Sequence, residues 1–195
     1  MVSHIFIDKN QVLIYILNFN IVYPEIYFYD CDLVMNTLSP AKTTIGWREW
    51  IALPDLGIPA VKAKIDTGAR TSALHAFFIE PFRENGQNKV RFRIHPLQRR
   101  TDIALTCVAD VIDQRMVSDS GGHSEMRYVI RSKIIIGTRR IEAEITLTDR
   151  DTMRFRMLLG RTALADKFLV DTSLSCITGP RPKKIYGLKK KRKKI

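Results

Sequence analysis

The chain has 195 residues, 45% of them hydrophobic, and a formal net charge of +12 at pH 7. This length and composition are enough to bury one substantial core, so we expect one main domain. The cysteines are few, scattered and odd in number, which argues against a disulfide framework and favours a reducing compartment, the cytoplasm. They are Cys31, Cys107 and Cys176.

The first 34 residues differ in character from the rest. Residues 11–29 are rich in Ile, Tyr and Phe, but polar residues and Pro24 interrupt them, so the apolar run is too short and broken to span a bilayer. A basic start and a small-residue cleavage site are also missing, so no secretory signal is predicted. We expect residues 1–44 to be a disordered extension, or an artefact of the assigned start if translation begins at Met35. An interfacial anchor is the alternative.

Residues 45–178 carry a pattern of β-strands. The clearest strand comes first, where Val61, Ala63 and Ile65 alternate with lysines. Further predicted strands cover 90–94, 107–112, 127–136, 139–147 and 155–159, with turns at 84–87 and 137–138 and a short helix over 162–168. Strands at this spacing predict an all-β fold, a small closed barrel with one short C-terminal helix.

The stretch Asp66-Thr67-Gly68-Ala69 directly follows the first predicted strand. A carboxylate at a strand end, followed by a small hydroxyl residue and glycine, predicts a tight turn that presents Asp66 at a surface. Taken alone, these are common turn residues, and a plain β-turn is the competing interpretation. The turn has a distant counterpart in residues 157–161, Met-Leu-Leu-Gly-Arg, an apolar run closed by glycine and arginine.

The two segments together resemble the retropepsin-like aspartic proteases, and most closely the bacterial and archaeal family commonly labelled "ATP-dependent zinc protease". The resemblance covers residues 45 to about 178 and is carried by three segments, 45–57, 63–75 and 157–161. It implies an acid-protease barrel in which a glycine-ended strand threads past the catalytic loop. Members of that family are often encoded near an ATP-grasp ligase that adds glutamates to a ribosomal protein, which implies a link to such tails.

Aspartic protease chemistry requires two carboxylates that share one proton, since two like charges so close cannot both ionise cheaply. This chain has one Asp-Thr-Gly, so the second Asp66 is expected from a symmetry-related copy in a homodimer. Thr67 would brace the paired loops through its hydroxyl, and Gly68 would allow their backbones to approach closely. Asp66, Thr67 and Gly68 are therefore the predicted catalytic residues of a hydrolase that cleaves peptide bonds.

One position departs from the retroviral pattern. Where those proteases have acidic residues after the turn, this chain has Arg70. A positively charged cleft attracts anionic ligands, so we expect acidic or glutamate-bearing peptides as substrates. The alternative is a non-catalytic module with the same fold that captures such peptides. The candidate substrate-binding residues are Ala69, Arg70, His75, His123 and Arg161.

The words zinc and ATP in the family label find little support in the residues. The four histidines and three cysteines show no zinc-site spacing, His-Glu-x-x-His is absent, and so is a phosphate-binding Gly-x-x-x-x-Gly-Lys loop. We therefore predict no metal and no other cofactor. A hydrogen-bonded structural role is the competing interpretation for His75. His123 lies in the Gly-rich loop 118–125, a candidate flap over the cleft.

Residues 179–195 form a basic tail. From Arg181 onward the chain has nine lysines and arginines and no acidic residue. Such a composition predicts disorder. The tail could contact RNA or the ribosome in a salt-dependent way, or it could be solvated without a partner.

Overall fold

The computed structural model describes residues 3–8, 11–16, 26–29, 41–98, 100–118, 122–149, 154–179 and 185–187. The chain divides into two units, Met1–Ala41 and Lys42–Ile195. In the first, strands β1 (Ser3–Asp8), β2 (Gln11–Ile16) and β3 (Ile26–Tyr29) pair as an antiparallel sheet. The prediction about residues 1–44 as a whole stays a prediction, and Met35 lies outside the described residues. Among the described residues of the chain, no helix is long and apolar enough to cross a membrane.

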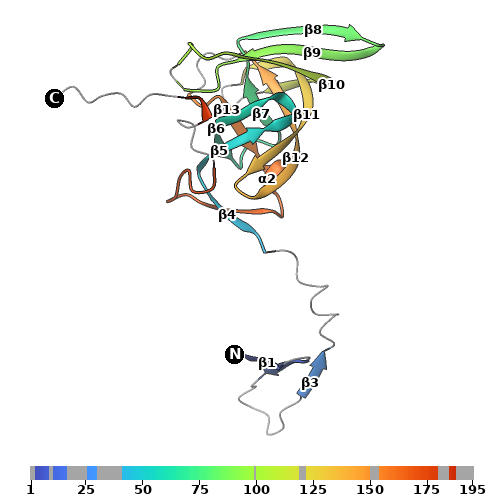
Figure 1. The fold of residues 1–195 in the computed structure, drawn as a ribbon. Coiled ribbons are helices and arrows are strands. Elements are labelled where there is room, and N and C mark those ends of the chain that lie inside the picture. The colour runs from blue at the N-terminus through green and yellow to red at the C-terminus, as the bar shows by residue number, and fades with distance from the viewer. Residues whose placement is uncertain are drawn as a thin grey trace, which may run out of the picture. The chain divides into compact units, whose positions relative to one another are not determined.

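The described part of the second unit is built almost wholly from strands (Figure 1). Its two short helical turns are η1 (Pro54–Leu56) and α2 (Arg161–Leu164). The strands are β4 (Thr43–Gly46), β5 (Arg48–Leu53), β6 (Ile58–Asp66), β7 (Ser72–His75), β8 (Phe78–Glu84), β9 (Gln87–Ile94), β10 (Leu105–Ser118), β11 (Ser124–Ile136), β12 (Arg139–Thr148), β13 (Met157–Gly160) and β14 (Phe168–Asp171).

The main sheet closes on itself. Its strand order is β12-β7-β13-β6-β5-β11-β10-β9-β8, and an additional β12–β11 pairing joins the first six strands into a ring. The remaining strands, β10, β9 and β8, continue outward from the ring as a flange (Figure 1). The predicted all-β class is therefore confirmed. The helix after β13 is shorter than the predicted 162–168, because the chain turns at Asp166, where φ is 62°, to enter β14.

The alternating pattern of the first predicted strand decides which side of β6 faces the core. Val61, Ala63 and Ile65 are buried, whereas Lys62 and Lys64 are half-buried and exposed. Because successive side chains of a strand point to opposite faces, this alternation fixes the register of the ring. Each large apolar side chain that is fully buried in this way stabilises the folded state by about 1.5–3 kcal/mol. The core continues through Ile51, Leu74, Phe92, Ile130, Ile134, Ile145 and Leu159.

Two predicted turns form hairpins. Asn85 and Gly86 between β8 and β9 have φ of 51° and 78°, as a two-residue hairpin turn with right-handed strand twist requires. Gly137, at φ 57°, joins β11 to β12. The outer edge of the flange is β8, where Pro81 removes one backbone donor and so discourages pairing with a foreign strand.

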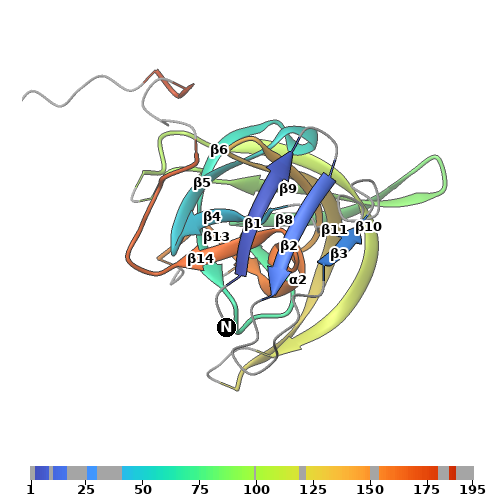
Figure 2. The same cartoon turned by 90° about the horizontal axis from the view of Figure 1, so that it is seen from below.

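Strand β10 changes partners midway along its length. Leu105–Asp110 pairs with β9, and Val111–Ser118 pairs with β11, with a register shift between Val111 and Asp113 that leaves Ile112 as a bulge. The second half of β10 and the first half of β11 thereby form a long two-stranded ribbon (Figure 2). Its described end is held by a 2.6 Å hydrogen bond between the hydroxyls of Ser118 and Ser124. The rest of the predicted flap loop, residues 119–121, lies outside the described residues.

A buried carboxylate fastens the segment that follows β14. Glu49 is fully buried, and its carboxylate accepts hydrogen bonds from the backbone N–H groups of Gly46 (2.8 Å), Ile177 (3.2 Å) and Thr178 (3.1 Å) and from the Thr178 hydroxyl (3.1 Å). The segment 174–179 is thereby held against β4 and β5. A Cβ on Gly179 would lie 2.0 Å from the Trp50 carbonyl oxygen, so the contact requires glycine there.

Candidate active site

The Asp-Thr-Gly-Ala turn lies in the loop that joins β6 to β7. These two strands are not neighbours in the sheet, because β13 lies between them, parallel to β6 and antiparallel to β7. The register places Gly160, the last residue of β13, beside Asp66, the last residue of β6. The late apolar-Gly-Arg segment therefore passes through the loop, as the resemblance implied.

The passage is tight enough to require glycine at position 160. A Cβ on Gly160 would lie 2.6 Å from the Thr71 carbonyl carbon and 2.8 Å from the Arg70 carbonyl oxygen. Its backbone N–H donates to the Ser72 hydroxyl at 3.1 Å, and the Thr146 hydroxyl donates to the Ser72 carbonyl oxygen, also at 3.1 Å. The crossing thus fixes the loop on its buried side.

Hydrogen bonds shape the loop on its exposed side. The Asp66 carboxylate accepts from the Ala69 N–H at 3.1 Å, which closes the turn. Arg161 donates its backbone N–H to the Ala69 carbonyl and a guanidinium N–H to the Gly68 carbonyl, both at 2.9 Å. Arg161 was predicted to bind substrate. In the structure it donates to two loop carbonyls, and its binding of substrate stays a prediction.

The tip of the loop faces outward. Asp66 is half-buried, and Thr67 and Gly68 are exposed. A Cβ on Gly68 would meet only the Asp66 carboxylate, at an ordinary 3.4 Å. The single chain therefore does not require glycine at position 68.

Asp66 opens into a cavity of about 780 Å³ beneath the ribbon of β10 and β11. The loop supplies Asp66, Gly68, Ala69, Arg70 and Thr71, so the cavity brings together four of the predicted site residues. From the ribbon and the adjoining strands come Ala73, Arg115, Met116, Val117, Ser118, Arg127, Thr146, Thr148 and Leu158. The ribbon therefore occupies the position expected of a flap.

The cavity is lined by three arginines, two of which are paired with carboxylates. Arg115 and Arg127 are directly opposite each other in the β10–β11 register, a like-charge pairing that is unfavourable unless it is compensated. Arg115 pairs with Asp113 at 2.8 Å and Glu144 at 3.1 Å, and Arg127 pairs with Glu125 at 2.5 Å. Three guanidinium groups, those of Arg70, Arg115 and Arg127, line the same cavity as one Asp66 carboxylate.

The two predicted histidines lie elsewhere. His75 is buried on β7, with 1% of its surface exposed, and its backbone N–H donates to the Arg156 carbonyl at 2.9 Å. His123 is exposed just before β11. Neither lines the cavity of Asp66. Sequence reasoning did not single out Arg115, Thr146 or Thr148, because nothing local shows that their strands meet over the loop.

A zinc ion would need a donor set, and the described residues offer none. No group of three or more His, Cys, Asp or Glu side chains is placed there to hold a metal ion. The described residues therefore do not fit the zinc of the family label.

The ring of strands and the threaded Asp-Thr-Gly loop define a retropepsin-like protein. The chain belongs to the RimB-like family, described as retropepsin-like aspartic endopeptidase RimB, whose model matches residues 44–181.

Similar proteins carry a different name. The chain is 46% identical over 160 residues to a probable alpha-L-glutamate ligase from Shewanella pealeana and 43% identical over 147 residues to one from Desulfotalea psychrophila. These alignments cover 80% and 75% of this chain but 35% and 32% of the relatives, so the chain spans about a third of their length. A crystal structure of a Legionella pneumophila protein of unknown function has a TM-score of 0.59 at 24% identity and covers 71% of this chain and 99% of that one. That likeness shows the fold.

Proposed function

We propose that this protein is an aspartic-type peptidase whose catalytic dyad is formed by Asp66 from each of two copies of the chain. The observation that carries the proposal is the threaded loop, which presents a half-buried Asp66 and an exposed Thr67-Gly68 tip at the edge of a large cavity. A pair of such loops facing each other across a two-fold axis brings two carboxylates together.

The chemistry follows from the shared proton. One Asp66 is ionised and takes a proton from the attacking water, while its partner is protonated and donates to the carbonyl oxygen of the scissile bond. The two apparent pKa values belong to the pair. Arg161 contributes by holding the Gly68 and Ala69 carbonyls, which keeps the loop in one conformation.

The charge of the cavity favours acidic peptides, such as glutamate-bearing tails. Arg70, Arg115 and Arg127 line the approach to Asp66. Arg115 and Arg127 are paired with carboxylates, whereas Arg70 has no ion pair among the described residues and would attract an anion. An extended peptide beneath the ribbon would bind through backbone hydrogen bonds and select its side chains through these arginines. The name glutamate ligase, carried by the relatives, is consistent with glutamate-rich material as the substrate of this domain.

The competing function is a binding module that holds acidic peptides without cleaving them. Arg70, which has no ion pair among the described residues, favours it, because capture of an anion needs no second Asp66. Most of the basic tail, residues 179–195, lies outside the described residues. Its contact with RNA or the ribosome, and a cytoplasmic location, remain proposals.

The variant Asp66→Asn separates the two functions. It keeps the size of the side chain and removes the ionisable group, so hydrolysis of a peptide library should stop while the folding and mass of the complex are unchanged. Wild-type hydrolysis should be fastest at acid pH and insensitive to a chelator, as a shared-proton dyad requires. Cleavage by the variant at the wild-type rate, or inactivation of the wild type by the chelator, would refute the dyad. Tight binding of acidic peptides without any cleavage would identify the module.

The arginines can be tested apart from the dyad. Arg115→Gln and Arg70→Glu should weaken the preference for a glutamate-rich over a lysine-rich peptide, with little effect on folding. Arg100→Gln is a matched control, because Arg100 is exposed, pairs with Asp102 and does not line the cavity. Equal use of both peptides by the wild type would exclude a preference for acidic ones.

A further inference from the structure

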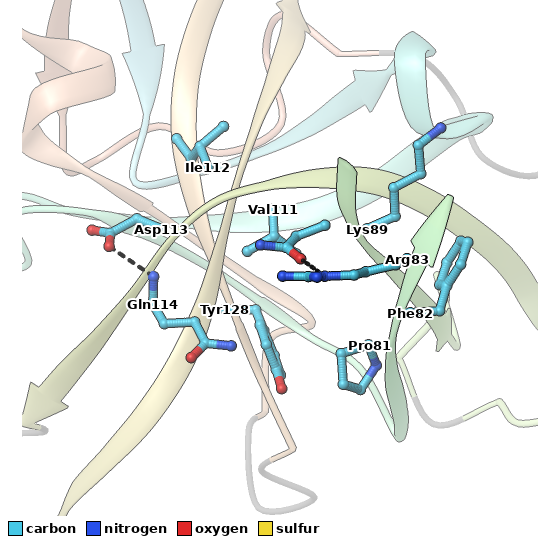
Figure 3. A pocket seen from close by; sticks show the side chains of 10 residues that line it. Pro81, Phe82, Arg83, Lys89, Val111, Ile112, Asp113, Gln114 and Tyr128 are labelled. Carbon is cyan, nitrogen blue, oxygen red and sulfur yellow. Dashed lines mark hydrogen bonds between the residues drawn. The ribbon is translucent and has the colours of Figure 1, made fainter. Parts of the chain in front are cut away.

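A second hollow, of about 530 Å³, lies where the flange meets the ribbon. Along β9 the inward side chains of Val90, Phe92 and Ile94 are buried in the core, but beyond Val90 the same face becomes exposed at Asn88. On β8, Pro81 and Arg83 point to this face, because they pair with Val90 and Asn88. The opposite wall consists of Val111, Ile112, Asp113, Gln114 and Tyr128, and Phe82 and Lys89 complete the rim (Figure 3).

This hollow is separate from the Asp66 cavity. Gln114 and Tyr128 are opposite each other in the β10–β11 register and line the hollow, whereas the next pair, Arg115 and Arg127, lines the cavity. The two sites have no lining residue in common, so they occupy successive stretches of the ribbon.

The walls of the hollow combine apolar and polar side chains. Pro81, Val111 and the ring of Tyr128 form the apolar part, and the bulge adds Ile112, which is 42% exposed. A bulge leaves one residue without a pairing partner and bends the strand, which opens the space here. An exposed aliphatic side chain at such a bend is a contact surface for an apolar group.

One charge in the hollow lacks a counter-ion. Arg83 donates its Nε–H to the Asn88 side-chain oxygen at 3.0 Å, and no carboxylate of the described residues pairs with it. The other charges are matched: Lys89 pairs with Glu84 and Asp110, and Asp113 pairs with Arg115. The guanidinium of Arg83 is therefore oriented by a neutral amide and keeps its two terminal nitrogens for a ligand (Figure 3).

We propose that this hollow binds a carboxylate carried by an apolar body, such as the C-terminal end of a peptide whose last side chain is apolar. The planar guanidinium of Arg83 matches a carboxylate with two parallel hydrogen bonds. Gln114 and Tyr128 add a carboxamide and a hydroxyl that make no side-chain hydrogen bond within the described residues. The volume suits one or two amino-acid residues or a compact acid.

Binding is tested by calorimetry and by amide shifts in NMR spectra of the whole chain. The probes are N-acetyl-phenylalanine, its neutral amide, and 3-phenylpropionate. The two acids should bind and shift the amide signals of residues 111–114 and Tyr128, and the neutral amide should bind at least about tenfold more weakly. Tighter binding of N-acetyl-phenylalanine than of 3-phenylpropionate would identify a peptide end as the source of the carboxylate, and equal binding a free acid.

Two variants decide the role of Arg83. Arg83→Gln should lower the affinity for the two acids at least about tenfold and leave the affinity for the neutral amide unchanged. Arg91→Gln is the control, because Arg91 lies on the same flange, pairs with Glu80 and does not line the hollow. Equal affinity for acid and amide, full affinity in Arg83→Gln, or no shift at residues 111–114 with millimolar probe would overturn the proposal. Asp66→Asn should bind the probes like the wild type, so the result is independent of peptidase activity.

Discussion

Gly160 and Gly68 belong to the same crossing of strand and loop, but the structure requires glycine at only one of these positions. A Cβ on Gly160 would press into the backbone of Thr71 and Arg70, whereas one on Gly68 would make an ordinary contact with Asp66. The backbone cannot yield as a flexible side chain can. Substitution at these two residues therefore separates what the fold needs from what the site needs.

Gly160→Ala should destabilise the protein by about 1–3 kcal/mol, since the added methyl group must displace backbone atoms. Gly68→Ala should change the free energy of unfolding by less than about 0.5 kcal/mol. If the paired loops approach through Gly68, that variant should still lower activity and weaken the dimer. Urea unfolding measures the change in stability, and sedimentation equilibrium measures the change in dimer affinity. Equal stability losses in the two variants would contradict the assigned roles.

Cys107 provides a pH-dependent contribution to stability. The thiol is buried, with 2% of its surface exposed, and burial raises its pKa from 9.0 to about 11. The folded state keeps the neutral thiol at pH values where the unfolded chain has already lost the proton. The stability that this neutral thiol contributes is therefore complete below pH 9 and is lost as the pH rises toward 11.

Relative to Cys107→Ala, the wild type should lose up to about 2–3 kcal/mol of unfolding free energy between pH 8 and 11. Denaturant titrations of both proteins across this range give the difference, in which the other titrating groups cancel. In the same range, the half-buried Cys176 should react with iodoacetamide before Cys107 does. A constant difference between the two proteins would show that Cys107 ionises equally in both states.

At the scale of elements, contacts between distant parts of the chain determine how the strands and their connecting segments pair. The partner exchange of β10 at Ile112 releases its second half to pair with β11 as a ribbon above the loop. The segment 174–179 is attached to the ring through Glu49, a residue more than 120 positions earlier in the chain. Both arrangements join parts of the chain whose local sequences give no sign of each other.

Glu49→Gln should destabilise the protein by about 1–3 kcal/mol, because one of the donors now at the carboxylate would meet an NH₂ group and lose its acceptor. Glu80→Gln, at an exposed pair with Arg91, should cost no more than about 1 kcal/mol. Thermal unfolding measures the stability of both variants. Protection of the Ile177 and Thr178 amides from hydrogen exchange should fall in Glu49→Gln alone. Unchanged protection there would exclude Glu49 as the attachment.

At the scale of the whole molecule, the proposed dyad makes activity a property of two chains. Mixing the wild type with Asp66→Asn at constant total protein and allowing exchange should lower the rate with the square of the wild-type fraction. An equal mixture should retain about one quarter of the wild-type rate, since only dimers with two intact Asp66 residues work. A monomeric enzyme would retain half. Sedimentation of the mixture confirms that the chains have exchanged.

Short-range patterns in the sequence determined much of this fold. The alternation at Val61, Ala63 and Ile65 and the turn at Asn85-Gly86 predicted a strand and a hairpin that the structure contains, because side-chain direction and turn geometry depend on neighbouring residues alone. The all-β class followed from the spacing of such strands, and the loop and its glycine partner were recognised through resemblance.

Tertiary structure alone decided how these parts meet. It placed β13 between β6 and β7, brought Arg115 and Arg127 opposite each other above Asp66, and turned Arg161 toward the loop carbonyls. It also left His75 buried and outside the cavity. Pairing between distant strands is fixed by the closing of the ring and the packing of its core, which depend on the whole chain at once, and no local pattern records them.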